Sequence, residues 1–333
     1  MLKTVNFIIL LFLLTPFLCK SQESARYLPE KPGKWSYSTN IKTPGAEVVA
    51  FNKNVANVAE WFHRNVSLFS NPKGFDLDVC AYGIWDDKYK LRPCNYGQRG
   101  ELNFNFLLFY SNGGQWKIEP PHWSFDINNT ETGHGSNFNL PGWDNTKDPA
   151  SFEKPMNKAA ADLNDLFQIF PFVRDIAPGV RLYDDGKLIV FNPDRPSFWI
   201  PVTMRELSVL FLGYYSLRNK TEMDQLLLDQ LKKEIADLTE EELNAPACEG
   251  HDSHFVLKAN GQKTGLQIMR FNPEYWDRSL PPSAIQLMTM FYPQMNEAEK
   301  EEHFKNNGYP VYGQLIMDAM KFDELAGLIS RKK

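Results

Sequence analysis

The sequence has few cysteines, no surplus of positive charge and no long apolar run beyond its N-terminal segment. Its 333 residues include only 4 cysteines and carry a formal net charge of −5. A mildly acidic chain without clustered Lys and Arg lacks the charge that nucleic acids or anionic membrane surfaces usually require of a partner. No later stretch reaches the roughly 18 apolar residues of a membrane helix. We therefore expect neither a nucleic-acid partner nor a transmembrane span.

Familiar catalytic motifs are missing as well. The chain contains no Gly-x-Ser-x-Gly elbow and no His-Glu-x-x-His pair. Gly133-His-Gly135 is not followed by the Gly-Lys-Ser/Thr of a phosphate-binding loop. These absences count against the common hydrolase and nucleotide-binding classes, without excluding less familiar enzymes.

The N-terminus has the features of a cleaved export signal. Lys3 precedes the uninterrupted apolar run Phe7–Leu14, and Cys19 and Ser21 are the small residues at positions −3 and −1 before Gln22. The run is too short for a convincing membrane anchor. We predict a secreted or periplasmic protein after cleavage near Ser21–Gln22.

Cysteine pairing is expected in an oxidising compartment. Cys80 and Cys94 are the closest pair in the exported chain. A disulfide across a loop of this length would stabilise the fold by about 3 kcal/mol in the chain-entropy model. We predict a disulfide between Cys80 and Cys94, which leaves Cys248 unpaired.

Hydrophobic periodicity predicts both strands and helices. Residues 75–82 and 101–110 alternate apolar and polar side chains, as in strands with one buried face. Asp184-Asp-Gly186 is typical of a hairpin turn. Because hairpin turns outnumber βαβ patterns, we predict an α+β fold of antiparallel sheet hairpins packed against amphipathic helices.

Helices are predicted where apolar residues recur at helical spacing. One begins at Asn54, another runs from Pro155 to Phe170, and the last runs from Pro310 through Ile329. Capping boxes are predicted at Thr203–Glu206, Thr239–Glu242 and Asn296–Glu299.

The chain divides into four parts on these patterns. Residues 1–21 form the signal, 22–46 an extended leader, 47–155 a strand-rich part, and 156–333 a part of mixed hairpins and helices. The last two parts form either one large domain or two small ones.

The segment 248–254, CEGHDSH, concentrates potential metal ligands. Cys248, His251 and His254 offer one thiolate and two imidazoles, which suit zinc, but only a loop conformation would let them converge. A polar loop without metal and a nucleophilic Cys248 activated by a neighbouring histidine are the alternatives. We expect no cofactor, with zinc as the alternative.

Aromatic and carboxylate side chains gather in and near the segment 122–144. Aromatic rings stack on the apolar faces of sugars, although tryptophans at this density more often pack in the core. Trp199, Trp276 and Asp126 belong to the same group of potential sugar contacts. The ligand-binding candidates are His122, Trp123, His134, Trp143 and Asp144.

These patterns favour a non-catalytic binding or envelope-associated module, with a carbohydrate or another envelope protein as partner. The alternative is a secreted hydrolase, glycan-acting or metal-dependent, that uses the loops at 122–144 and 248–254.

Overall fold

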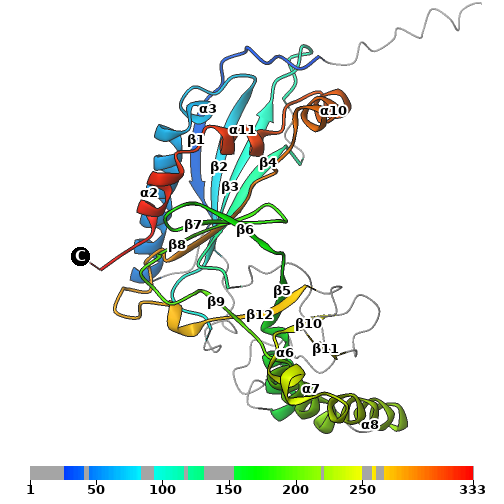
Figure 1. Ribbon diagram of the computed structural model, residues 1–333. Coiled ribbons are helices and arrows are strands. Elements are labelled where there is room, and N and C mark those ends of the chain that lie inside the picture. Colours follow the sequence, from blue (N-terminus) through cyan, green and yellow to red (C-terminus); the bar gives the residue numbers. More distant parts are fainter. Residues whose placement is uncertain are drawn as a thin grey trace, which may run out of the picture.

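The computed structural model describes residues 26–40, 45–83, 94–115, 119–130, 154–218, 221–249, 257–259 and 266–332. These residues form an eight-stranded sheet and a smaller five-stranded sheet, with helices packed against both (Figure 1). The predicted α+β class is confirmed. No helix in the described ranges has the length and apolar character needed to cross a membrane.

The large sheet combines strands from distant parts of the chain. β13 pairs with both β4 and β8, so the strands before residue 130 and those after residue 170 share one sheet. β1 runs parallel to β2, and the other neighbours are antiparallel. In sheet order the strands are β1 (Trp35–Thr39), β2 (Phe75–Gly83), β3 (Gly100–Leu108), β4 (His122–Ile127), β13 (Leu287–Phe291), β8 (Lys187–Phe191), β7 (Val180–Tyr183) and β6 (Phe172–Ala177).

One face of the large sheet is buried by the long helix α2 (Ala46–Asn65), which the short α3 (Ser67–Ser70) follows. Phe62 of α2 is fully buried, with ring centroids 5.5 Å from Phe104 and 5.3 Å from Phe125. The helix begins at Ala46 rather than at Asn54. Asn54 does not cap it; its side-chain amide donates to the carbonyl of Ser283 at 2.8 Å.

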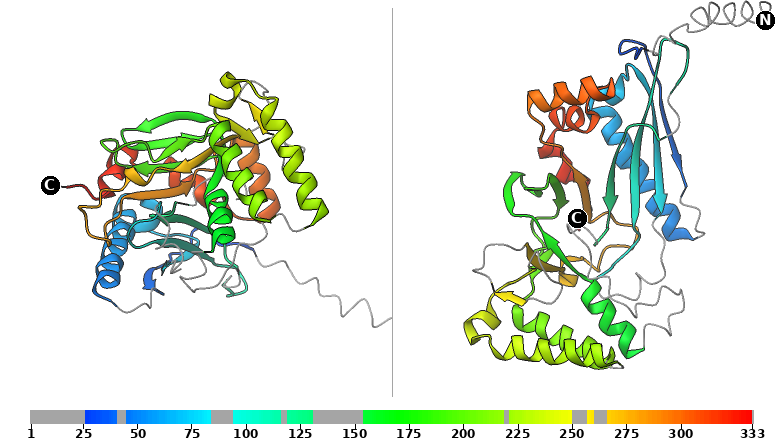
Figure 2. Two further views of the ribbon diagram at one scale, coloured as in Figure 1. Left: turned by 90° about the horizontal axis from the view of Figure 1, so that it is seen from below. Right: turned by 90° about the vertical axis from the view of Figure 1, so that its right-hand side faces the viewer.

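The short helices that follow Gly308 complete the cover of the same face (Figure 2). Tyr312 stacks on Phe106 with ring centroids 4.1 Å apart. Gly308, in the left-handed region at φ 78°, ends the helix that precedes them. The single helix predicted from Pro310 is divided into short pieces. The helix before Gly308 is α10 (Glu297–Asn307). The pieces after Pro310 are α11 (Tyr312–Asp318), α12 (Phe322–Leu325) and the 3₁₀ turn η3 (Ala326–Leu328).

A smaller sheet and four helices form a second layer. The helix predicted to reach Phe170 ends at Asn164, because Leu166–Ile169 pairs with β12 instead. The strands are β11 (Leu257–Ala259), β10 (Ala247–Glu249), β12 (Gln267–Phe271), β5 (Leu166–Ile169) and β9 (Trp199–Pro201), followed by the 3₁₀ turn η2 (Pro273–Tyr275). The helices are α6 (Pro155–Asn164), α7 (Met204–Arg218), α8 (Glu222–Ala236) and α9 (Glu240–Asn244).

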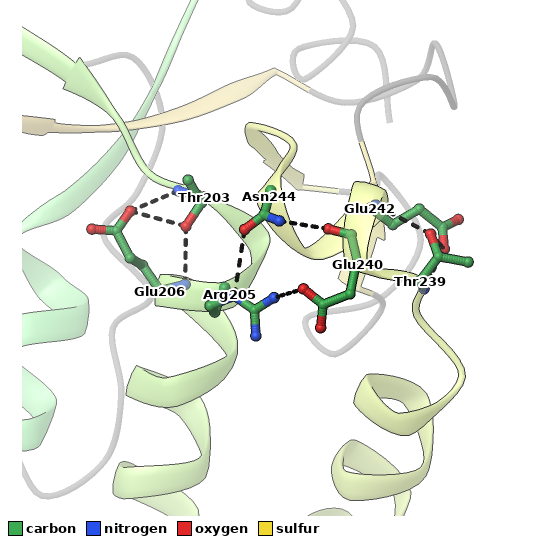
Figure 3. A network of polar contacts seen from close by, with 7 residues as sticks. All are labelled: Thr203, Arg205, Glu206, Thr239, Glu240, Glu242 and Asn244. Atoms are coloured by element: carbon green, nitrogen blue, oxygen red, sulfur yellow. Dashed lines mark hydrogen bonds and ion pairs between the residues drawn. The ribbon is translucent and has the colours of Figure 1, made fainter.

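The predicted capping boxes are confirmed at α7, α9 and α10. At α7 the backbone N–H of Thr203 donates to the Glu206 carboxylate at 2.9 Å, and the N–H of Glu206 donates back to the Thr203 hydroxyl at 3.2 Å. Arg205 then reaches Glu240 of α9, which joins the starts of the two helices (Figure 3). Satisfied backbone donors stabilise each helix start by about 0.5–2 kcal/mol.

A shared aromatic cluster holds the two sheets together. Tyr183 and Leu287 of the large sheet pack with Trp199 and Phe271 of the small one. The guanidinium of Arg195 donates to three backbone carbonyls in 274–276, each at 2.8 Å. The two sheets therefore share buried surface rather than being joined only by a linker.

Candidate functional site

The predicted metal segment is only partly described. Cys248 is buried in β10, while His251 and His254 lie outside the described residues. Burial raises the pKa of the Cys248 thiol, which disfavours the thiolate that zinc binding or nucleophilic attack requires. Within the described ranges, no three or more His, Cys, Asp and Glu side chains are placed to hold a metal ion.

The disulfide predicted between Cys80 and Cys94 is not formed in the structure. The Cys80 sulfur lies on the sheet face opposite the apolar core and accepts a hydrogen bond from Asn40 Nδ2 at 3.5 Å. Cys94 packs against the cluster between the sheets, and its carbonyl accepts the indole N–H of Trp276 at 2.6 Å. Cys94 is thus positioned by contacts with residues far along the chain. Its closeness to Cys80 in sequence does not reveal these contacts.

Three tryptophans considered for sugar stacking are core residues. Trp123 and Trp199 are 4% exposed and Trp276 is 2% exposed, so none presents a ring face to solvent. Trp143, with His134 and Asp144, lies outside the described residues.

The other two ligand-binding candidates, His122 and Trp123, meet in a pocket of about 340 Å³. It lies where the start of β4 and the end of β13 meet α10 and α11 (Figure 1). Protein ligand sites usually span about 300–1,000 Å³, so this pocket suits a small molecule. Its walls are Pro121, His122, Trp123, Phe291, Pro293, His303, Tyr309, Pro310, Val311, Tyr312 and Gly313.

Prolines and one glycine create this space. Pro121 precedes β4, Pro293 follows β13 and Pro310 precedes α11, so the pocket walls include segments whose backbone φ is fixed. At Gly313 an added Cβ would lie 3.2 Å from a Pro293 ring carbon and 3.3 Å from Trp123 Cδ1. Glycine therefore allows the close approach of α11 to Trp123.

Most polar atoms identified in the pocket walls already have partners. The Trp123 indole N–H donates to the Phe291 carbonyl at 3.1 Å. The hydroxyls of Tyr312 and Tyr27 share a hydrogen bond of 2.9 Å, and burial raises the pKa of both. The exposed residues of the pocket lining are His122 and Phe291.

His303 of α10 is the exception. Its ring lies edge-on to Tyr309 with centroids 5.5 Å apart. Nδ1 is 3.3 Å from the side-chain amide nitrogen of Asn307. Nε2 is shielded from solvent and has no hydrogen-bond partner in the part of the chain that the structure describes.

A second polar feature crosses the opposite face of the large sheet. Glu101, Asp126 and Thr289 lie directly opposite one another on β3, β4 and β13. The Thr289 hydroxyl oxygen is buried and makes no hydrogen bond within the described residues. We call these three residues the carboxylate row.

Burial is the main cause that raises the pKa of Asp126, and the neighbouring Glu101 raises it further. The Asn129 amide and the cations Arg99 and Lys187 act in the opposite direction. Burial also lowers the pKa of the Lys187 amine, although Asp185 lies 3.8 Å away. Both shifts favour neutral forms, so charge on Asp126 and on the nearby Lys187 is poorly solvated.

Comparisons of the chain with known protein families, curated sequences and solved structures found no match. The site residues that sequence patterns missed, Phe291, His303 and Tyr309, come from segments far from His122. One local signal was available: His303 and Asn307 are four residues apart on a helix, a spacing at which side chains meet.

Proposed function

We propose that the protein is an exported, non-catalytic binding module that holds a small apolar ring in the pocket beside His122. The observation that carries this proposal is a cavity of about 340 Å³ walled by aromatic rings and prolines. Concave, mostly apolar sites with few polar groups are the usual form of small-molecule sites. The signal-like N-terminal segment supports export.

The pocket lining, made mostly of aromatic and proline residues, favours an apolar ligand over a carbohydrate. Phe291 is 54% exposed, whereas the tryptophan in the wall is buried. A single ring of about ten heavy atoms is expected to bind with a Kd of about 0.1–1 mM, given the usual energy per ligand atom.

Ethylbenzene binding, followed by chemical-shift changes in NMR spectra, tests this proposal. We expect Phe291→Ala to weaken binding about fivefold, because an aromatic pair contributes roughly 0.5–1.5 kcal/mol beyond its buried area. Phe304→Ala is the matched control, since Phe304 is 51% exposed on α10 but does not line the pocket.

Two outcomes would contradict the proposal. One is that the wild-type protein gives no saturable shifts with ethylbenzene. The other is that methyl glucoside binds while ethylbenzene does not, which would favour a carbohydrate ligand.

A glycan-acting hydrolase is the second candidate, because the carboxylate row places two acids side by side. Opposed residues on antiparallel strands have Cβ atoms about 4.5–5.5 Å apart, compatible with the roughly 5–5.5 Å between carboxyl groups in retaining glycosidases. Asp126, with its raised pKa, would donate a proton to the glycosidic oxygen, and Glu101 would attack the anomeric carbon. Aryl glycosides test it: absence of hydrolysis, or activity unchanged in both Asp126→Asn and Glu101→Gln, removes this candidate.

A further inference from the structure

Asn307 fixes the position of the ring proton on His303. The side-chain nitrogen of Asn307 donates to the backbone carbonyl of His303 at 2.9 Å, and a carbonyl can only accept. That contact identifies the nitrogen end of the amide, and the same nitrogen lies 3.3 Å from His303 Nδ1. Because an amide nitrogen donates and does not accept, Nδ1 must be the acceptor. The neutral ring therefore carries its proton on Nε2.

The Nε2–H group is a buried donor without a partner. Its nitrogen has less than 1 Å² of accessible surface and no hydrogen bond within the described residues. Leaving a donor unpaired in this way is unfavourable, whereas a ligand that accepts from it removes the penalty. The indole of Trp123 and the hydroxyl of Tyr312 do not compete, since each already has a partner.

We infer, on the basis of the proposed binding function, that the pocket selects a small apolar ring that carries a hydrogen-bond acceptor, which His303 Nε2–H recognises. The ring fills the space between the aromatic and proline walls. The acceptor, a carbonyl or ether oxygen, pairs with the buried donor. Because Nε2 is buried, this contact requires a rotation of wall side chains that uncovers the nitrogen, a change common when ligands bind.

Acetophenone and ethylbenzene form the matched pair of probes, because they share a substituted benzene ring and differ mainly in the carbonyl oxygen. We expect the affinity ratio of acetophenone to ethylbenzene to be about tenfold higher in the wild-type protein than in His303→Phe, the change of one neutral hydrogen bond. His303→Phe keeps a ring in the wall and removes both ring nitrogens, the Nε2 donor among them. Taking the ratio between proteins cancels the different water solubilities of the probes.

Asn307→Asp provides an independent test on an exposed residue. A carboxylate only accepts, so it requires a proton on Nδ1 and leaves Nε2 of the neutral ring as an acceptor. We expect the preference for acetophenone to disappear. The affinity of 4-ethylphenol, whose hydroxyl donates a hydrogen bond, should rise relative to that of ethylbenzene. Long-range ¹H–¹⁵N spectra of the imidazole, recorded where the ring is neutral, should show the proton on Nε2 in the wild type and on Nδ1 in the variant.

The outcomes separate this inference from the function on which it rests. Equal affinity ratios in the wild type and His303→Phe, or a wild-type ring protonated on Nδ1, would overturn the acceptor selection while the pocket remained a binding site. Failure of both probes to bind the wild type would overturn the proposed function, and the inference with it.

Discussion

Along β3 and β4, the two faces of the large sheet are built by the same strands and have opposite chemistry. On β3, Leu102, Phe104 and Phe106 are fully buried against α2 and α11, while Glu101 and Asn103 lie on the other face and are partly exposed. The buried face provides cohesion, and the other face carries the carboxylate row. The pocket opens at the strand ends, where the aromatic core reaches the surface. The difference shows that the same alternation can serve stability on one side and chemistry on the other.

Shortening a core ring should have the largest effect. Phe104 lies within 6.3 Å, centroid to centroid, of Trp35, Phe62 and Phe69. Phe104→Ala is expected to lower the free energy of unfolding by about 3–5 kcal/mol. Asn103→Ala, the adjacent residue on the polar face, should change it by less than about 0.5 kcal/mol. Denaturant titration measures both, and equal losses would contradict the contrast between the faces.

Asn128 makes four hydrogen bonds that join the end of β4 to the starts of β3 and β13, and its loss should rank second. Its amide donates to the carbonyls of Gln98 and Ala284 at 2.9 and 2.8 Å, and its oxygen accepts the N–H groups of Gln286 and Leu287. Asn128→Ala should cost about 2–3 kcal/mol, because it leaves buried backbone groups unpaired.

The matched control for Asn128 is Asn112→Ala, at an exposed turn where the side chain accepts one hydrogen bond from Gly114. We expect a loss of no more than about 1 kcal/mol there. A midpoint shift in Asn128→Ala no larger than in Asn112→Ala would show that the hydrogen bonds of Asn128 do not hold the sheet together.

Apart from the control substitutions, the smallest effect is expected from Asp126→Asn, and it should be stabilising. The folded pKa of Asp126 is raised, so its contribution to stability is present below the unfolded pKa and is lost as pH rises through the folded pKa. Removing this charge opposite Glu101 should raise the free energy of unfolding by about 0.2–1 kcal/mol at pH 7. The gain should vanish at a pH below the unfolded pKa, where the wild-type carboxyl is protonated. A gain that is the same at both pH values would contradict a charge effect.

Elements fixed by local pattern could be predicted from the sequence. The hairpin turn at Asp184-Asp-Gly186 follows from its Asp-Gly step, and the structure places β7 and β8 on either side of it. The capping boxes at α7, α9 and α10 succeed for the same reason, since each involves residues three apart.

Elements that depend on distant partners could not be predicted from the sequence. Leu166–Ile169 continues a helical spacing, but pairing with β12, about 100 residues later, overrides that local preference. The pocket has the same origin, because His122 and His303 meet only through the order of strands in the large sheet. Sequence patterns named His122 as a candidate, and the structure places it in the pocket lining, but they gave no indication of the other lining residues.

A crystal structure with acetophenone soaked into the pocket tests the central claim most directly. The account predicts the ring between the walls formed by Phe291 and Tyr309. The carbonyl oxygen should lie about 2.9 Å from His303 Nε2, the usual length of an N–H···O hydrogen bond. A ring bound elsewhere, or an oxygen turned toward solvent with Nε2 still unpaired, would contradict it.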